Sequence, residues 1–209
     1  PSHPIMNQPR KSLFIVAGML AVSAVPAFAA KAKIGGKAPE FTLTDVNGES
    51  HALSVFAGKT VVREKVNPEC PFVVKHCRSF NMPKLQSAAA TEDTIWLSIN
   101  SGAPGAQGDC EPDEVKNWMK TTGASPAAYL RDQDGMVGRL YGARTTPHMF
   151  VINPDGDFVF NGAIDSIPSA NTRDLDRARN YAKAALAAVA AGDELAKSTS
   201  RRYGCSVKY

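Results

Sequence analysis

The strongest constraint on the fold is an alternation of strand-like and helix-like segments that runs from about residue 41 to residue 192. Strand-like segments are rich in β-branched residues or alternate apolar with polar residues, whereas helix-like segments repeat apolar residues every three or four positions. No internal repeat, low-complexity tract or interdomain linker interrupts them. Helices between strands, followed by a hairpin and a closing helix, predict an α/β domain in which helices cover both faces of a central mixed sheet.

Shorter signals place the individual elements. Asx-Gly pairs predict two β-hairpins, one in an N-terminal extension over residues 41–53 and one over residues 148–160. Asn171 or Thr172 is suited to cap the last helix, which carries an apolar stripe. The other expected elements are strands at 60–66, 94–100 and 128–130 and helices at 71–86, 112–122 and 137–141.

The first thirty residues have the layout of a secretory signal peptide. Arg10 and Lys11 precede an uncharged run of 18 residues that ends in small residues. An uncleaved membrane anchor is the alternative, because this run reaches the lower length limit for crossing a bilayer, but its many alanines disfavour an anchor. We expect an N-terminal extension and signal peptide in residues 1–30, with the signal at about 6–30, then one domain over residues 31–209 and a periplasmic or secreted location.

The charge balance excludes some partners. Removing Arg10 and Lys11 from the 24 basic residues leaves 22 against 20 acidic residues, and the basic residues form no block. This balance predicts no nucleic-acid or anionic-membrane partner, and we expect no stable membrane insertion once the signal is cleaved. Four cysteines remain in the mature chain and would enter a compartment that permits disulfides. Four are too few for a disulfide scaffold, so each is considered separately.

Cys70 lies where a strand pattern ends and a helix pattern begins, in Asn67-Pro68-Glu69-Cys70-Pro71. Pro71 suits the first helical position, because the N–H that proline lacks is not needed there. Cys70 is therefore expected at the helix N-cap, where unpaired N–H groups and the helix dipole lower a thiol pKa. We expect Lys75 and His76 to add positive potential. The alternative is a buried cysteine that acts as a small apolar residue.

Several motifs resemble the thioredoxin-like superfamily, where the alkyl hydroperoxide reductase/thiol-specific antioxidant (AhpC/TSA) family and the periplasmic thioredoxin-like redoxins meet. They are GKAPEFTLTDVNGESHAL, NPECPFV, Pro83 in the following helix, YGARTTPHMFVINPDG and the closing YGCSVKY. The resemblance implies a thioredoxin fold in which Pro147 is a cis-proline facing Cys70 and Thr146 presents its backbone to a substrate. Pro71, Thr146 and Pro147 are thus the predicted substrate-binding residues.

Three positions depart from the related patterns. A thioredoxin-type Cys-x-x-Cys would need a second cysteine at Val73. The peroxiredoxin pattern would have a proline in place of Arg63 and a threonine or serine in place of Asn67. Neither parent activity can therefore be transferred directly to this chain.

Arg63 and Lys65 are unexpected in the predicted strand over residues 60–66. An inner strand is covered on both faces and should be apolar, and burying an unpaired charge is costly. Either this face is open to solvent near the site, or the stretch is altered and the protein is less stable than its relatives.

A redox cycle within one chain requires a second thiol. Cys77 lies on roughly the same helical face as Cys70, but the helical rise separates their Cα atoms by about 10 Å, beyond the limit of about 7 Å for a disulfide. Cys205 lies in the tail YGCSVKY, which resembles the C-terminal resolving arms of two-cysteine thiol enzymes; a structural disulfide that fixes the tail is the alternative. Cys110 is interpreted as an incidental thiol or a structural partner. The predicted catalytic residues are Cys70 and Cys205, with Cys77 as the second choice for resolution.

The main hypothesis is an exported thioredoxin-fold thiol oxidoreductase without cofactor or metal. Cys70 would attack a peroxide or a protein or small-molecule disulfide, Cys205 would resolve the product, and an external thiol would reduce the enzyme again. A second hypothesis is a copper metallochaperone similar to the Sco-type proteins, because thiols with His76 or His148 would suit copper. The six-residue gap between Cys70 and Cys77 differs from the three-residue gap of that group. A third is a non-catalytic thioredoxin-fold protein with structural disulfides.

Overall fold

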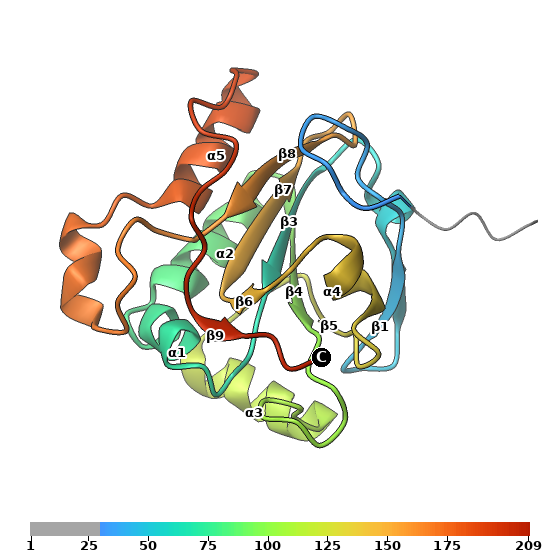
Figure 1. The fold of residues 1–209 in the computed structure, drawn as a ribbon, viewed down its shortest axis with the longest axis vertical. Coiled ribbons are helices and arrows are strands. Elements are labelled where there is room, and N and C mark those ends of the chain that lie inside the picture. Colours follow the sequence, from blue (N-terminus) through green and yellow to red (C-terminus); the bar gives the residue numbers. More distant parts are fainter. Residues whose placement is uncertain (1–29) are drawn as a thin grey trace, which may run out of the picture.

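The structure is a computed structural model of the chain and describes residues 30–209. Seven strands form one mixed sheet in the order β2-β1-β5-β4-β3-β7-β8 (Figure 1). In this sheet β3 and β5 are both parallel to β4, whereas β7 is antiparallel to β3 and to β8. The strands are β1 (Thr42–Asp45), β2 (Ser50–Ala52), β3 (Thr60–Lys65), β4 (Thr94–Asn100), β5 (Ala128–Arg131), β7 (His148–Ile152) and β8 (Phe158–Gly162).

Helices cover both faces of this sheet. On one face, Met82 of α2 and Ala182 of α5 pack against Val62 and Trp96 of the sheet. On the other face, Val137 of α4 packs with residues of the N-terminal hairpin, such as Phe41. The helices are η1 (Leu53–Phe56), α1 (Pro71–Arg78), α2 (Asn81–Thr91), α3 (Pro112–Thr122), α4 (Met136–Leu140), η2 (Thr172–Arg177) and α5 (Tyr181–Ala191). This is the predicted thioredoxin fold with an N-terminal β-hairpin.

The expected helix over residues 71–86 is wrong, because the chain forms two helices, α1 and α2. Phe80 separates them in a left-handed conformation, with φ of 58°. Pro83 explains the break: in a continuous helix its missing N–H would leave the carbonyl of Ser79 without a partner, whereas in the first turn of a new helix that N–H is not needed. The Ser79 hydroxyl group instead donates a hydrogen bond to the carbonyl of Lys75 at 2.8 Å, which closes α1.

The expected last helix beginning at Asn171 or Thr172 is also two elements. Asn171 caps the short 3-10 helix η2, accepting a hydrogen bond from the N–H of Arg173 at 3.1 Å. Ala178 is then extended, with ψ of 134°. Asn180 starts α5 by accepting from the N–H of Lys183 at 2.9 Å. Two N-caps nine residues apart thus divide the stretch that the apolar pattern assigns to one helix.

Strand β3 buries both basic side chains that are unexpected in its sequence. Lys65 donates to the hydroxyl of Ser101 and lies 3.7 Å from the carboxylate of Asp132. The guanidinium of Arg63 lies 3.5 Å from the ring centre of Tyr141. Burial lowers the pKa of Lys65 to about 7 and that of Arg63 to about 10. The face is therefore covered rather than open to solvent, and local partners compensate these charges in part.

Glu64 is a third buried ionisable residue in β3. Its side chain points to the opposite face and accepts hydrogen bonds from Trp96 Nε1 at 2.9 Å and Ser98 Oγ at 2.9 Å. Burial raises the pKa of this carboxyl group, although the hydrogen bonds oppose the effect. An inner strand of this fold thus carries three consecutive ionisable residues, each with a partner on its own face.

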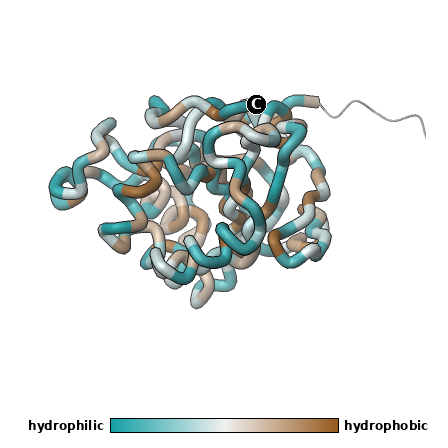
Figure 2. Tube along the Cα trace, turned by 90° about the horizontal axis from the view of Figure 1, so that it is seen from below, coloured by the Kyte–Doolittle hydropathy of each residue, from teal (hydrophilic) through white to brown (hydrophobic). Residues whose placement is uncertain are grey.

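The chain returns to the middle of the fold at its C-terminus. Residues 198–209, which we call the C-terminal arm, run from the edge of β8 across the ends of the central strands (Figure 1). Figure 2 shows the C-terminus at the edge of the molecule rather than inside it. Within the arm, β9 (Cys205–Ser206) pairs antiparallel with β6 (Thr145–Thr146), which places Cys205 opposite Thr146. Among residues 30–209, no helix has the length and apolar character needed to cross a membrane.

Candidate functional site

The structure brings Cys70 and Cys205 together although they are 135 residues apart in the sequence. Their Sγ atoms lie 2.8 Å apart, at hydrogen-bond distance. Cys70 is the N-cap of α1 and Pro71 its first residue, as the sequence predicts. Cys70 is completely buried, whereas Cys205 is partly exposed. Small thiol movements would therefore suffice to join the two sulfur atoms in a disulfide.

Three features hold the C-terminal arm in this position. Ser200 pairs with Asn161 at the edge of β8, through its N–H to the carbonyl at 3.2 Å. Gly204 has φ of 125° and passes so close to the carbonyl oxygen of Thr146 that any Cβ would collide with it. Beyond Cys205, the backbone carbonyl of Lys208 accepts a hydrogen bond from the N–H of Ala103 at 2.7 Å. The arm is thus docked along its length, and Gly204 is required where it approaches the strand before Pro147.

The Thr146–Pro147 peptide bond is cis, as the family resemblance implies. The carbonyl oxygen of Thr146 lies 3.0 Å from Cys70 Sγ and accepts a hydrogen bond while that thiol is protonated. The hydroxyl of Thr146 is buried and, among residues 30–209, has no hydrogen-bond partner that meets normal geometry. Cys70, Thr146, Pro147 and Cys205 therefore form one compact site at the start of α1.

The two thiols differ in their acidity. Burial would raise the pKa of Cys70, but the Cys205 thiol, the nearby polar side chain of Thr146 and the N–H of Val73 together outweigh burial and hold this pKa below its ordinary value. Burial and the adjacent Cys70 raise the pKa of Cys205 to about 11. Near neutral pH Cys205 is therefore a thiol that donates to Cys70, and Cys70 is the more readily ionised sulfur.

The expected contribution of Lys75 and His76 to this acidity is not observed. Lys75 forms a buried ion pair with Asp165, whose carboxylate lies 3.1 Å from its Nζ atom. Burial lowers the pKa of His76 to about 4, so its ring is neutral near pH 7. His76 also lies beside Asp165, with its Nε2 atom 3.7 Å from the carboxylate. The N–H groups at the start of α1 and the Cys205 thiol, rather than these two residues, lower the pKa of Cys70.

Asp165 connects α1 to the C-terminal arm. Besides Lys75, it accepts a hydrogen bond from the hydroxyl of Tyr203 at 2.5 Å, and the Tyr203 ring packs edge-on against Phe72 with centroids 5.6 Å apart. Tyr203 is two residues before Cys205, so this contact fixes the arm close to the sulfur pair. No sequence motif signals Asp165, and Tyr203 is visible in the sequence only as part of the closing motif YGCSVKY.

The other two cysteines lie in the same apolar cluster as Cys70 but do not contact its sulfur through a hydrogen bond. Cys77 is buried, and burial raises its pKa to about 12. Cys110 is partly exposed, and burial with nearby acidic residues raises its pKa too. Neither thiol is poised to ionise near neutral pH. The structure thus brings Cys205 to Cys70 and leaves Cys77 as an apolar packing residue.

His76 and His148, the imidazoles considered for a copper site, form no cluster of three potential metal ligands with the cysteines among residues 30–209. His76 Nδ1 lies 2.8 Å from Asn81 Nδ2, and His148 Nε2 lies 2.6 Å from Asn161 Oδ1. Within residues 30–209, the one group of three metal-binding side chains is Asp45, Glu49 and His51 on the N-terminal hairpin. Its buried carboxylate, Asp45, already accepts hydrogen bonds from two backbone N–H groups of the hairpin turn, as in an ordinary Asx turn.

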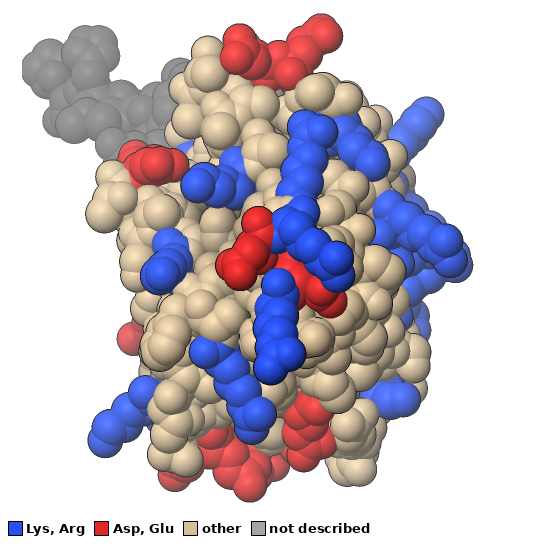
Figure 3. Space-filling view, turned by 90° about the vertical axis from the view of Figure 1, so that its left-hand side faces the viewer, with Lys and Arg blue, Asp and Glu red and all other residues tan. Residues whose placement is uncertain are grey.

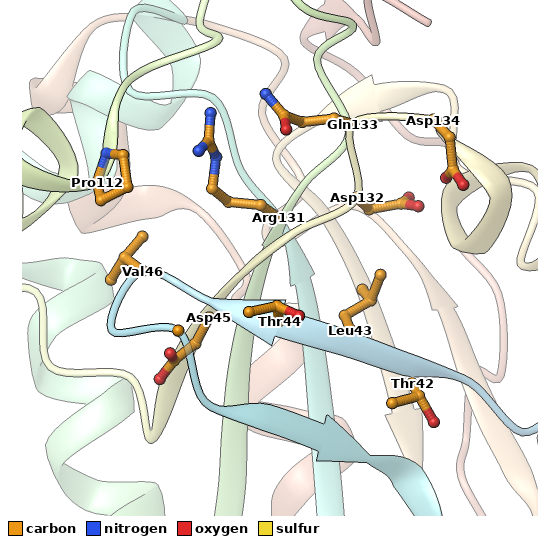
Figure 4. A pocket seen from close by; sticks show the side chains of 11 residues that line it. Thr42, Leu43, Thr44, Asp45, Val46, Pro112, Arg131, Asp132, Gln133 and Asp134 are labelled. Carbon is orange, nitrogen blue, oxygen red and sulfur yellow. The ribbon is translucent and has the colours of Figure 1, made fainter.

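A separate pocket of about 510 Å³ opens between β1 and the end of β5 (Figure 4). Figure 4 shows Arg131 and Gln133 pointing to the same side above β1. Both side chains bind the carboxylate of Asp109, at 3.3 Å and 2.9 Å. None of the residues that line this pocket is a cysteine. The pocket is therefore distinct from the sulfur pair. Arg131 and Gln133 hold the loop that carries Asp109.

Comparisons with known proteins agree with this geometry. The sequence profile of the AhpC/TSA family matches residues 34–160. A hypothetical protein from Sinorhizobium meliloti 1021 is 24% identical with a TM-score of 0.71, and the match covers 87% of this chain and 97% of that one. An uncharacterized conserved protein from Geobacillus kaustophilus is 24% identical with a TM-score of 0.70, covering 87% and 94%.

A more distant neighbour is the thioredoxin domain of a thiol-disulfide oxidoreductase from Bacteroides vulgatus. It is 17% identical with a TM-score of 0.51, and the match covers 70% of this chain and 98% of that one. No curated protein matches the chain. The solved structures establish the thioredoxin fold, and because the family match spans more than half of the sequence, the chain belongs to the AhpC/TSA family.

Proposed function

We propose that the protein is a thiol oxidoreductase in which Cys70 and Cys205 alternate between a dithiol and a disulfide. The observation that carries this proposal is the 2.8 Å separation of their Sγ atoms beside Thr146 and Pro147. The lowered pKa of Cys70 and the raised pKa of Cys205 support different roles for them. Cys70 is the nucleophile, and Cys205 resolves the intermediate.

The reaction balances for both substrate classes that the family suggests. With a peroxide, the Cys70 thiolate attacks one peroxide oxygen, the O–O bond breaks, Cys70 becomes a sulfenic acid, and the other oxygen leaves as an alcohol or water after protonation. The Cys205 thiol then condenses with the sulfenic acid and releases water. With a disulfide substrate, the Cys70 thiolate forms a mixed disulfide and expels one thiol. Cys205 then attacks Cys70 Sγ and expels the second. Both routes end in the same Cys70–Cys205 disulfide.

Burial of Cys70 bears on which substrate reaches it. The side chain is covered by the docked arm, with Cys205 above its sulfur. A small peroxide needs only a narrow opening, whereas a protein disulfide requires the arm to leave β6. Reaction rates with hydrogen peroxide and with a disulfide-bonded peptide therefore distinguish the two substrate classes in the intact protein.

Disulfide mapping after oxidation tests the central claim. We expect the wild-type chain to form a Cys70–Cys205 disulfide, and a Cys77→Ser variant to behave identically. Cys205→Ser should accumulate a peroxide-dependent sulfenic acid that a dimedone probe traps, whereas Cys70→Ser should give none. A disulfide that joins other cysteines, or unchanged sulfenic acid in Cys70→Ser, would contradict the proposal.

Export is a second part of the proposal and is supported by the sequence of the first thirty residues alone. A periplasmic or secreted location would keep the pair in an oxidising compartment, where it needs a thiol donor to be reduced. N-terminal sequencing of the protein from fractionated cells should give a new terminus close to residue 30. An intact signal region in the cytoplasmic fraction would reject export and leave the redox proposal unaffected.

A further inference from the structure

A second pocket, of about 600 Å³, lies directly beside the C-terminal arm. Its lining includes Gly204 and Thr145, the sequence neighbours of Cys205 and Thr146, whereas Cys205 and Thr146 themselves are not on the lining. Ser166 and Pro168, in the loop after β8, lie on the lining too. The size is within the range of sites that hold small molecules. A ligand in this pocket would lie next to the segment that carries the resolving sulfur.

The pocket, which we call the basic pocket, is lined by Lys197, Arg201 and Arg202. None of the three forms an ion pair with another residue in the part of the chain from 30 to 209. The one carboxylate on the lining, Asp165, is already paired with Lys75 at 3.1 Å. Figure 3 views the side of the molecule that carries α5 and shows basic side chains around a few acidic ones in its middle, with further basic side chains along its right-hand edge. The basic pocket therefore favours an anionic ligand.

The two sulfur atoms of the pair are not equally accessible. Cys70 is completely buried at the start of α1, whereas Cys205 lies partly exposed on the outer strand β9. An external thiol that attacks the disulfide would therefore meet Cys205 first. The leaving sulfur would be Cys70, whose thiolate is stabilised at the helix N-terminus, and a stabilised thiolate leaves faster.

We propose that the oxidised protein is reduced by a small thiol bearing carboxylate groups, which binds in the basic pocket and attacks Sγ of Cys205. This inference rests on the proposed redox function and names its reductant. In the first step the thiolate forms an S–S bond with Cys205, the Cys70–Cys205 bond breaks and Cys70 leaves as a thiolate. A second molecule of the same thiol then attacks the sulfur of the first molecule in the mixed disulfide. It releases the small disulfide and returns Cys205 as a thiol, so two electrons from two thiols reduce one protein disulfide.

Reduction rates with thiols of different charge test this proposal. The oxidised full chain is mixed at low salt with mercaptosuccinate, 2-mercaptoethanol or cysteamine, and free thiols are counted over time after acid quenching. Each rate is divided by the rate of the same thiol with hydroxyethyl disulfide, which corrects for intrinsic reactivity. We expect mercaptosuccinate to be favoured over 2-mercaptoethanol by about tenfold and cysteamine to be disfavoured. Salt at about 0.5 M should abolish the difference, because it shortens the Debye length to only a few Å.

Matched variants locate the effect. Lys197→Gln, Arg201→Gln and Arg202→Gln combined should remove the preference for mercaptosuccinate and leave the corrected rate of 2-mercaptoethanol within about twofold. Lys84→Gln, Lys116→Gln and Lys120→Gln combined remove the same charge from exposed positions on α2 and α3 and should keep the preference.

Three results would overturn the proposal. The first is equal corrected rates for the three thiols in wild-type protein, and the second is a preference that survives loss of the three pocket cations. The third is a mixed disulfide that mass spectrometry places on Cys70 instead of Cys205. Absence of any Cys70–Cys205 disulfide before reduction would instead reject the proposed function itself, so the two failures are distinguishable.

Discussion

Replacing Asp165 by asparagine should destabilise the protein strongly, because it breaks a buried ion pair on one side only. The carboxylate lies 3.1 Å from the ammonium group of Lys75, and the side chain of Lys75 is fully buried. Asparagine has nearly the same volume, so packing is retained while the negative charge is lost. Removing one partner of a buried pair leaves an uncompensated buried charge and typically costs about 3–5 kcal/mol.

This loss is a large part of the stability of a single domain, which is usually about 5–15 kcal/mol. For a domain of this size, about 1 kcal/mol corresponds to about 2–4 °C in Tm, so Asp165→Asn should lower Tm by about 6–20 °C. Urea unfolding followed by circular dichroism, together with a thermal scan, measures both quantities. The slope of the urea transition should not change, because the surface exposed on unfolding is the same.

Two comparisons make the test specific. Asp93→Asn removes the carboxylate of an exposed pair with Lys59 and should cost no more than about 1 kcal/mol. Lys75→Met combined with Asp165→Leu removes both charges and should recover much of the stability that Asp165→Asn loses. The reasoning is refuted if Asp165→Asn costs as little as Asp93→Asn, or if the double variant is no more stable than the single one.

The remaining predictions concern the sulfur site and two buried imidazoles. Gly204→Ala should slow formation of the Cys70–Cys205 disulfide by about 100-fold, because the new Cβ would collide with the carbonyl of Thr146 and displace the arm; stopped-flow oxidation measures this rate. Thr146→Val should raise the pKa of Cys70, because the threonine side chain helps to lower it, and iodoacetamide alkylation should then shift to higher pH. His76 and His148 stay neutral in the fold, with pKa values of about 4 and about 3, whereas both titrate near pH 6.5 when unfolded. The unfolded state therefore binds more protons between pH 6.5 and 4, and the free energy of unfolding should fall as the pH falls through this window, by up to about 1.4 kcal/mol per pH unit for each imidazole.

Each of these predictions has a comparison variant within the chain. Gly105→Ala places a Cβ at a positive φ without a close contact and should leave disulfide formation unchanged. Thr145→Val removes the neighbouring hydroxyl and should leave the Cys70 pKa where it is. His76→Gln removes one of the two buried imidazoles and should reduce the slope of this pH dependence between pH 6.5 and 5.5. Opposite behaviour in any of these variants would contradict the corresponding prediction.

Elements with strong local signals could be predicted from the sequence nearly to the residue. Helix α3 begins at Pro112 and ends at Thr122 as expected, because Glu111 and Glu114 form a capping box and Gly123 is left-handed at the C-cap. Both hairpin turns occur at their Asx-Gly pairs, with φ of 86° at Gly48 and 82° at Gly156. In these places one short segment contains everything that determines the backbone.

Predictions failed where helical periodicity continued across a break in the backbone. The apolar pattern runs from α1 into α2, and neither Ser79 nor Phe80 interrupts it. The position of Pro83 is compatible both with a distorted helix and with the first turn of a new one. The charges of β3 are a similar case. Arg63, Glu64 and Lys65 receive their partners from other elements, and spacing along one strand gives no information about those partners.

The position of Cys205 depends on contacts that are individually invisible in the sequence but constrain one another in the structure. Tyr203 holds the arm to Asp165, Gly204 lets it pass the Thr146 carbonyl, and the pairing of β9 with β6 then fixes which side chain lies over Cys70. A one-residue shift of this short pairing would turn the Cys205 side chain to the opposite face. The proposed resolving role therefore requires the whole sequence Tyr203-Gly204-Cys205, with the anchor, the close approach and the thiol at consecutive positions. This explains why a cysteine at the far end of the chain meets Cys70, whereas Cys77, seven residues away, is held apart from it by the helix they share.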